Sequence, residues 1–435
     1  MAPLSKSTPI AVIGGGAFGL STALHLVQNN YTDITVFEQD DQIPPRYSAA
    51  NDLNKIVRAE YEDPFYTDLT VEAIAAWKTP LFAPHFHQTG FLHCASGAAP
   101  PKAIDTLRRF QNAARRHPTI APHVVTVNGP GDIRPWFWQC DGPLPGWEGY
   151  MNRFDGYAHS GNALAAIYRV THAAGVKFFL GAQQGGVKEI MYKDGKSVSV
   201  KTADGKSHAS ELVIVAAGAG VGKILPTLGT QIVAKSWSVA HVLLSGEETS
   251  ALRGIPVTYA RDLGFFFEPD PKTNLLKLCP MGGGYVNTDK ATGVSHSPFP
   301  EDLETSSGFL PAEDESRIRK LLQQTLPALA DRPLVRKSLC WFADTKDSDF
   351  IIDFVPGSKG SVVIVSGDSG HGFKMFPIVG RWVRTLLEDE DKEQKIQRWR
   401  WKEEGGKEED WGSDVSWRLG ESRELRDVLP GTVKL

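Results

Sequence analysis

The chain has 435 residues, with 41% hydrophobic and 23% charged residues, which are ordinary values for a globular protein and allow two interleaved domains with large cores. A formal net charge of −4 gives no electrostatic reason to expect nucleic acid as a partner, and no apolar run approaches the roughly 20 residues that span a membrane. The four cysteines contain no C-x-x-C pair, so we expect a reducing compartment, no disulfide framework and no metal site.

The first forty residues predict a strand, a glycine turn, a helix and a second strand. Gly14 permits a tight turn, Gly16 lets the backbone approach phosphates, and Gly19 lets the helix pack closely on the strand. The second apolar strand ends in Glu38, an acidic residue that can accept hydrogen bonds from an adenosine ribose. A glycine motif alone is weak evidence, but this order of elements predicts binding of FAD or NAD.

Helical and strand periodicity continues after this unit. The pattern predicts helices from Pro64 to Trp77 and over 163–174, and a strand over 176–180. The Pro-, Gly- and Trp-rich stretch 91–149 resembles an irregular insertion. The pairs Asp194-Gly195 and Asp204-Gly205 predict hairpin turns.

The second half of the chain contains two further buried strands. The apolar run 212–215 ends in small residues and predicts a parallel strand that returns to the nucleotide site. Alternating strand-like runs and loops over 225–345 predict a largely antiparallel region. A strand over 361–366 leads into a glycine-containing loop, a helix follows from about Pro377, and a loosely packed tail is expected after Trp401.

Three segments together resemble a known family. They are the glycine-rich start, Ala216-Ala217-Gly218-Ala219, and Gly367-Asp368-Ser369-Gly370-His371-Gly372-Phe373-Lys374. The chain resembles the flavin amine oxidases of the sarcosine oxidase type, and within them the fungal fructosyl amino acid oxidases (amadoriases) and the pipecolate and saccharopine oxidases. Four more segments share this resemblance, which extends to about Trp401: Asn51–Ile56, Gly264–Asp270, Cys340–Thr345 and Arg398–Arg400.

The resemblance implies an α/β fold in which a Rossmann-like FAD-binding domain carries a mostly antiparallel β-sheet substrate domain, as in the glutathione-reductase-like FAD fold. The FAD-binding domain is expected over 1–90, 150–224 and 346–400, the substrate domain over 91–149 and 225–345, and the tail over 401–435. The implied reaction is oxidation of the C–N bond of a secondary amine by FAD. The imine is then hydrolysed, and dioxygen reoxidises the reduced flavin and is released as hydrogen peroxide.

The resemblance also implies how FAD is held. Cys340 matches the position that joins the 8α-methyl carbon of FAD covalently, a bond that requires a thiolate. For a cysteine without this motif, a small buried hydrophobic role would be the commoner case. The other implied cofactor contacts are Gly14, Gly16, Ala17, Phe18, Gly19, Glu38, Ser48, Asn51, Lys55, Gly218, Asp368, Gly370, Gly372, Phe373 and Lys374.

Two lysines are implied to be catalytic, Lys277 and Lys55. Lys277 stands mid-strand among apolar residues, where an edge-strand lysine that faces solvent would otherwise be the commoner case. By resemblance it is the lysine that helps oxygen accept an electron near flavin N5. A fixed positive charge stabilises the superoxide formed in that step.

The resemblance further implies that Arg58 and Lys374 clamp the substrate α-carboxylate, because a guanidinium pairs bidentately with a carboxylate and lysine adds a point charge. The alternative for Arg58 is a surface ion pair with Glu60 or Glu62. The other implied substrate contacts are Asp52, Phe266, Met281 and Phe342.

Some residues depart from the family pattern. Met281 follows Cys279-Pro280 where amadoriases carry a sugar-binding glutamate and sarcosine-type enzymes a histidine, and Phe342 stands where the latter often have tyrosine. This wall is apolar, which favours a bulkier or more apolar secondary amine over fructosyl amino acids. We interpret His371 as shaping the backbone near the flavin. His85 and His87 are interpreted as structural.

These observations predict a monomeric covalent FAD oxidase of N-substituted α-amino acids such as fructosyl amino acids, saccharopine, pipecolate or sarcosine, with a small amine and dioxygen as its partners. Three alternatives remain open: a flavin enzyme that tailors a larger amine in secondary metabolism, a dehydrogenase with another electron acceptor, and a flavin-holding protein without turnover. The terminal Val433-Lys434-Leu435 is a degenerate match to the peroxisomal Ser-Lys-Leu signal, so a peroxisomal or cytoplasmic location is expected.

Overall fold

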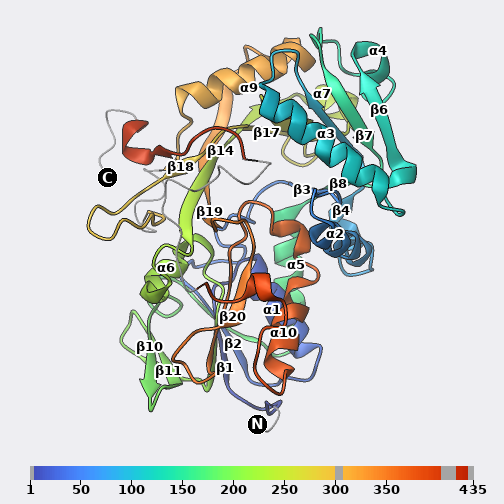
Figure 1. The fold of residues 1–435 in the computed structure, drawn as a ribbon. Coiled ribbons are helices and arrows are strands. Elements are labelled where there is room, and N and C mark those ends of the chain that lie inside the picture. Colours follow the sequence, from blue (N-terminus) through green and yellow to red (C-terminus); the bar gives the residue numbers. More distant parts are fainter. Residues whose placement is uncertain (1–3, 299–306, 403–417, 430–435) are drawn as a thin grey trace.

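The computed structural model describes residues 4–298, 307–402 and 418–429, which build two sheet-centred regions (Figure 1). The region that contains the N-terminus is centred on a six-stranded sheet of order β20-β21-β13-β1-β2-β9. Five strands are parallel, and β20 pairs antiparallel with β21 at the edge. The strands are β1 (Ile10–Ile13), β2 (Ile34–Glu38), β9 (Lys177–Leu180), β13 (Leu212–Val215), β20 (Ile351–Phe354) and β21 (Val362–Ser366).

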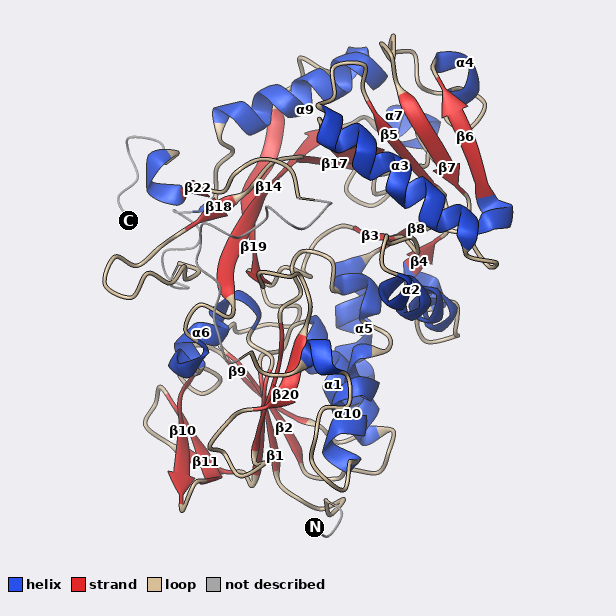
Figure 2. Ribbon diagram, in the orientation of Figure 1, coloured by secondary structure: helices blue, strands red, loops and turns tan. Residues whose placement is uncertain are grey.

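Both faces of this sheet are covered, which explains its unbroken apolar strands. Figure 2 shows helices α1 (Ala17–Val27), α5 (Ser160–Ala173) and α10 (Val379–Glu388) along one side. On the helix side, residues of α10 pack with every second residue of the strands in one core cluster. The strand residues Ala11, Ile13 and Val213 point the other way and belong to a second cluster on the opposite face. That other face packs on a small antiparallel sheet and on short helix α6; these elements are β10 (Val187–Lys193), β11 (Lys196–Thr202), β12 (Ser207–Ala209) and α6 (Val221–Ile224).

The second region is centred on a ten-stranded, mostly antiparallel sheet. Two long strands, β14 and β19, pair antiparallel along most of their length and reach down toward the first region (Figure 1). Its strands are β5 (Phe91–Ala95), β6 (Val124–Asn128), β7 (Glu148–Asn152), β14 (Val233–Leu243), β15 (Val257–Ala260), β16 (Gly264–Phe266), β17 (Leu275–Pro280), β18 (Tyr285–Val286), β19 (Leu334–Asp344) and β22 (Arg423–Glu424). Its helices are α3 (Pro101–Arg116), α4 (Pro130–Ile133), α7 (Gly246–Ala251) and α9 (Ala312–Thr325).

A small three-stranded sheet of order β3-β8-β4 lies between the two regions, beside helix α2 (Figure 2). This sheet places strand β3 beside the cavity that extends to the ten-stranded sheet. The elements are β3 (Lys55–Val57), β4 (Phe86–His87), β8 (Gly156–Ala158) and α2 (Pro64–Trp77).

The predicted α/β fold is confirmed, and several local predictions hold in detail. Helix α2 begins and ends where its periodicity indicated, because the Asp63 carboxylate accepts a hydrogen bond from Phe65 N (3.0 Å) and caps the first turn. The Asp194-Gly195 turn joins β10 to β11 with φ of 51° and 78°, as a type I′ hairpin requires.

Two expectations were wrong. Residues 91–149 are not irregular: they contain three strands and the amphipathic helix α3, whose buried residues Ala103, Leu107, Phe110 and Ala114 recur at helical spacing. The tail is not loosely packed in its described part, because β22 pairs with β18 and Leu425 is fully buried. The Val433-Lys434-Leu435 signal lies outside the described residues. The domain boundaries stay a prediction, and β7 spans the expected one at residue 150.

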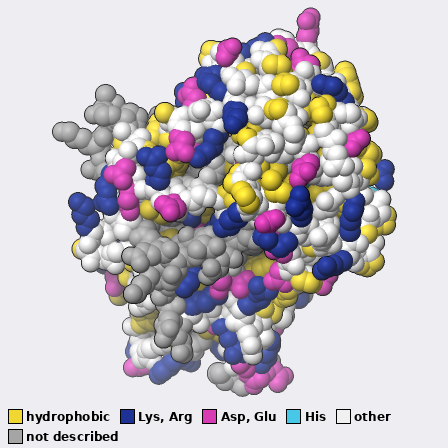
Figure 3. Space-filling model, turned by 45° about the horizontal axis from the view of Figure 1, so that its top comes forward, with side chains coloured by type: hydrophobic (Ala, Val, Ile, Leu, Met, Phe, Trp, Pro, Cys, Tyr) yellow, Lys and Arg dark blue, Asp and Glu magenta, His cyan; other side chains and the backbone are white. Residues whose placement is uncertain are grey.

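The surface fits the near-neutral composition. On the face shown in Figure 3, acidic and basic side chains are interspersed, without a field of one sign. None of the helices in the described ranges combines the length and hydropathy needed to cross a membrane.

Candidate active site

The glycine turn brings β1, β2 and helix α1 together. Gly14 has a φ of 110°, a conformation that favours glycine, and a Cβ there would overlap the carbonyl oxygen of Ala216. A Cβ at Gly19 would overlap the carbonyl oxygen of Gly14, so helix and strand can approach only because both residues are glycine. The Glu38 carboxylate accepts hydrogen bonds from Gly15 N (2.8 Å) and Asp40 N (2.9 Å), which fixes it beside the turn.

A cavity of about 1040 Å³ starts at this turn and extends to the ten-stranded sheet. Ordinary small-molecule pockets measure roughly 300–1,000 Å³, so this volume leaves room for a large cofactor together with a substrate. The predicted site residues that line it are Gly14, Gly16, Ala17, Phe18, Glu38, Ser48, Lys55, Arg58, Gly218, Lys277, Met281, Cys340, Phe342, Asp368, Gly370, Phe373 and Lys374.

The residues at the turn fit a dinucleotide. Helix α1 has Gly16 at its N-cap with no side-chain cap, so the first N–H groups of the helix are available to an anion in the cavity. Glu38, at the end of β2, can accept hydrogen bonds from a ribose. Burial raises the pKa of Glu38, and the backbone N–H groups of Asp40, Gly15 and Gln39 oppose that rise.

A buried charge centre occupies the floor of the cavity. Lys277 is only 1% exposed, and its ammonium contacts the Asp52 carboxylate and donates to the carbonyl oxygen of Asn54 (2.8 Å). Lys55 Nζ lies 3.0 Å from the same carboxylate. Burial opposes ionisation of Asp52, but the Lys277 and Lys55 charges outweigh it and hold the pKa of Asp52 well below its ordinary value. Two positive charges thus share one negative charge at the cavity wall.

The two cavity-lining cysteines differ in their surroundings. Cys340 is partly exposed, and its Sγ lies 3.8 Å from Lys55 Nζ. Cys279 is buried, and burial raises the pKa of its thiol to about 11. Cys340 is therefore the more accessible thiol of the two.

Arg58 and Lys374 line another wall of the cavity, where both contact Tyr61. The Arg58 guanidinium lies over the rings of Tyr61 (4.8 Å) and Phe110 (4.7 Å) and donates to the backbone carbonyl of Glu60. Lys374 Nζ donates to Tyr61 Oη at 2.7 Å and to a backbone carbonyl. Burial, with the Arg58 charge nearby, lowers the pKa of Lys374 well below its ordinary value.

The structure rejects the surface alternatives for Arg58 and Lys277. The Glu60 side chain is fully buried and accepts hydrogen bonds from Tyr150 Oη (2.8 Å) and Asn152 Nδ2 (3.0 Å). Glu62 instead pairs with Arg109 at 3.0 Å. Arg58 therefore makes no surface ion pair with either acid, and the buried Lys277 does not face solvent.

Two predicted substrate contacts, Phe266 and Asp52, do not line the cavity, and three predicted cofactor contacts lie behind its wall. Phe266 is fully buried against Phe137, because side chains alternate along a strand and its neighbours Phe265 and Phe267 face the cavity instead. Asp52 binds the two lysines rather than lining the cavity. The residues that do not line it but support its wall are Gly19, Asn51 and Gly372.

Sequence reasoning missed several aromatic residues of the cavity. Trp237 packs on Phe342 with ring centroids 4.5 Å apart, and Tyr259 Oη lies 3.0 Å from Met281 Sδ. Nothing in the sequence indicated that the Tyr61 hydroxyl would contact Lys374. His371, interpreted as a backbone-shaping residue, lines the cavity. Its two ring nitrogens hydrogen-bond to Tyr61 Oη and to the carbonyl oxygen of Ser348.

Comparison with known proteins adds three findings. The model of the family described as FAD dependent oxidoreductase matches residues 9–386. L-saccharopine oxidase of Schizosaccharomyces pombe is 32% identical, across 95% of this chain and 96% of the relative, and peroxisomal sarcosine oxidase of Mus musculus is 24% identical, across 86% and 90%. The crystal structure of the deglycating enzyme fructosamine oxidase (amadoriase II) from Aspergillus fumigatus superposes with a TM-score of 0.87 and 32% identity, across 98% of this chain and 97% of that chain.

Proposed function

The chain belongs to the family of FAD-dependent oxidoreductases whose model matches residues 9–386, and from this we propose that it oxidises secondary amines that carry an α-carboxylate. The family resemblance expected from the glycine turn and the Gly367–Lys374 loop is confirmed. Saccharopine, sarcosine and fructosyl amines, the compounds named in the relatives, are all secondary amines. These relatives favour an amine oxidase over an enzyme that tailors a larger amine.

A single observation carries the proposal. One cavity joins the glycine turn, where a dinucleotide fits, to the Arg58–Lys374 pair and the Lys277–Asp52–Lys55 charge centre. FAD held in this cavity would supply the redox chemistry, which is acceptance of a hydride from the carbon beside the amine nitrogen and reduction of dioxygen. The protein's own contribution is to hold, orient and shield the substrate.

Each wall of the cavity has a distinct task in this proposal. Arg58 and Lys374 bind the carboxylate, which fixes the position of the neighbouring C–N bond. Phe265, Phe267 and Phe342 exclude water from the reacting centre while the C–N bond is oxidised. The imine then takes up one water molecule outside this centre and gives an aldehyde or ketone and an amine. Lys277 provides the fixed positive charge that favours electron transfer to dioxygen, and Asp52 orients it.

We also propose that Cys340 holds FAD covalently as a thioether. Its partly exposed Sγ beside Lys55 supports this choice over the buried Cys279. The apolar Met281 wall supports an N-substituted α-amino acid without a sugar. A monomeric state and a peroxisomal or cytoplasmic location remain part of the proposal.

The experiment is anaerobic mixing of the FAD-loaded protein with sarcosine, pipecolate, saccharopine and a fructosyl amino acid, each matched with an analogue that lacks the carboxylate. We expect loss of the yellow colour with at least one amino acid and release of hydrogen peroxide when air is admitted. Equal reduction by an amino acid and its carboxylate-free analogue would contradict the proposed substrate class.

A further inference from the structure

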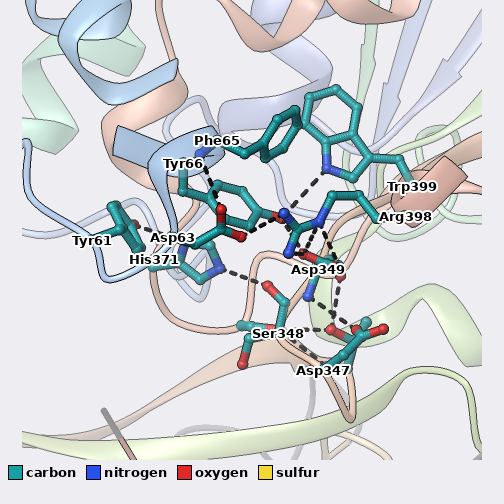
Figure 4. A network of polar contacts seen from close by, with 12 residues as sticks. Tyr61, Asp63, Phe65, Tyr66, Asp347, Ser348, Asp349, His371, Arg398 and Trp399 are labelled. Atoms are coloured by element: carbon teal, nitrogen blue, oxygen red, sulfur yellow. Dashed lines mark hydrogen bonds and ion pairs between the residues drawn. The ribbon is translucent and has the colours of Figure 1, made fainter. Parts of the chain in front are cut away.

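The Lys374 side-chain nitrogen is held by a chain of hydrogen bonds that starts at Ser348, behind the cavity. Lys374 Nζ donates to Tyr61 Oη (2.7 Å) and to the carbonyl oxygen of His371 (2.8 Å). Tyr61 Oη lies 2.9 Å from His371 Nδ1, and His371 Nε2 lies 2.8 Å from the carbonyl oxygen of Ser348. Figure 4 shows the His371 ring between Tyr61 and Ser348.

The direction of this chain follows from chemistry. A carbonyl oxygen can only accept a hydrogen bond, so His371 Nε2 carries the proton that points to Ser348. Burial, together with the Lys374 charge, lowers the pKa of His371 well below its ordinary value, so the ring is neutral and Nδ1 is an acceptor. Tyr61 must therefore donate to His371, which leaves the Tyr61 oxygen to accept from Lys374.

Besides its bond to carbon, the Lys374 nitrogen has three directions that can hold an N–H or a lone pair. Two of them point to the protein acceptors Tyr61 and His371, and the third is left to the cavity, which Lys374 lines. A neutral Lys374 would present a lone pair there, and a protonated Lys374 a third N–H. Only the protonated form can donate to a carboxylate, so this one position decides whether Lys374 can bind the substrate.

We propose that Tyr61 and His371 are positioning residues, which hold Lys374 so that its third N–H points into the cavity and its proton is taken up together with the substrate carboxylate. This inference rests on the proposed function, because it assigns Lys374 to carboxylate binding. It deepens that function by identifying two residues that act on the substrate carboxylate through Lys374.

The surroundings keep this chain rigid. The His371 ring stacks on Phe350 at a centroid distance of 5.3 Å and meets Tyr66 edge-on at 5.4 Å. Tyr66 Oη donates to Asp349 (2.7 Å), which Arg398 also contacts (3.0 Å) (Figure 4). The ring therefore cannot rotate freely to reverse the direction of its hydrogen bonds.

The charges around Lys374 explain why its proton depends on a ligand. The titratable groups that face it, besides Tyr61 and His371, are Arg58, Glu60 and Asp155. The Arg58 cation opposes protonation of Lys374, while Glu60 and Asp155 favour it. A substrate carboxylate adds a negative charge on the cavity side and shifts this balance toward the protonated form.

The test uses the FAD-loaded full chain and methoxyacetate, a carboxylate in which an ether oxygen replaces the amine, so that no oxidation occurs. Binding is followed from the visible spectrum and by calorimetry, from mildly acidic to mildly alkaline pH and in two buffers with different ionisation enthalpies. Tyr61→Phe removes the hydroxyl but keeps the ring under Arg58. Tyr66→Phe is the matched control, because the Tyr66 hydroxyl contacts Asp349 outside the chain.

We expect Tyr61→Phe to weaken methoxyacetate binding about tenfold or more at neutral pH, because a charged donor loses its acceptor. As the pH rises, Tyr61→Phe should lose methoxyacetate binding at a lower pH than the parent does, since the Lys374 ammonium is less stable without the Tyr61 hydroxyl. Tyr66→Phe should do neither. His371→Gln, whose amide can both donate and accept, should keep the parent behaviour, and His371→Leu should lose it.

The parent should take up protons on binding at alkaline pH, as judged by the difference between the two buffers. An unchanged pH dependence in Tyr61→Phe, or the same loss in Tyr66→Phe, would overturn the positioning role while leaving the proposed function intact. No binding of methoxyacetate by the parent at any pH would instead overturn the proposed function, and with it this inference.

Discussion

Replacing Asp52 by asparagine removes the carboxylate that both Lys277 and Lys55 contact. The two ammonium groups would then share a buried wall without a counter-charge. At the 3.0 Å between Lys55 Nζ and Asp52 Oδ2, Coulomb's law with an effective dielectric constant of about 20 gives about 5.5 kcal/mol. Desolvation offsets part of this attraction, and loss of one partner of a buried ion pair costs ~3–5 kcal/mol.

We therefore expect Asp52→Asn to lower the free energy of unfolding by ~3–5 kcal/mol near neutral pH, measured by urea denaturation of the full chain. The matched control is Asp33→Asn, because Asp33 pairs with Lys177 at 2.9 Å on the surface, where such pairs contribute ~0–1 kcal/mol. The lysines hold the pKa of Asp52 below that of an unfolded chain. The stabilisation is thus present above roughly pH 4 and is lost as the pH falls further, so the two proteins should converge in acid.

Equal stability of Asp52→Asn and the parent at neutral pH would refute this reasoning. So would a deficit that persists unchanged in acid, because a pure packing defect does not depend on the charge of Asp52. A loss of the same size in Asp33→Asn would show that the effect does not come from burial of the pair.

Three further predictions concern the cavity. Cys340→Ser should release all FAD into the supernatant on acid precipitation, whereas the parent pellet should stay yellow; a yellow variant pellet would place the bond elsewhere. Lys277→Met should slow reoxidation of the reduced protein by dioxygen about 10²–10³-fold, measured by stopped flow, because a preorganised charge is lost, and an unaltered rate would remove Lys277 from that step. Arg58→Ala should weaken methoxyacetate binding by ~2–5 kcal/mol without changing reoxidation, and equal affinity in both proteins would contradict the carboxylate clamp.

The sequence by itself determined the local parts of this site. The glycine turn needs only neighbouring residues, since Gly14 and Gly19 are required by backbone contacts between adjacent elements. The unbroken apolar strands indicated a parallel sheet covered on both faces, and the capped helix α2 was predicted to its ends. Such features depend on local sterics and periodicity, which the order of residues encodes directly.

The tertiary structure alone decided which side chains face one another. The register of strand β16 turned Phe266 into the core and its neighbours into the cavity, because side chains alternate and one residue decides the face. Asp52 meets Lys277 across 225 residues of sequence, and Tyr61 meets His371 across 310. No local sequence pattern predicts contacts between residues so far apart in the sequence. A buried charge or hydroxyl contacts its partner only after sheet pairing and packing have brought the two segments together, and that partner then sets its ionisation and hydrogen bonding.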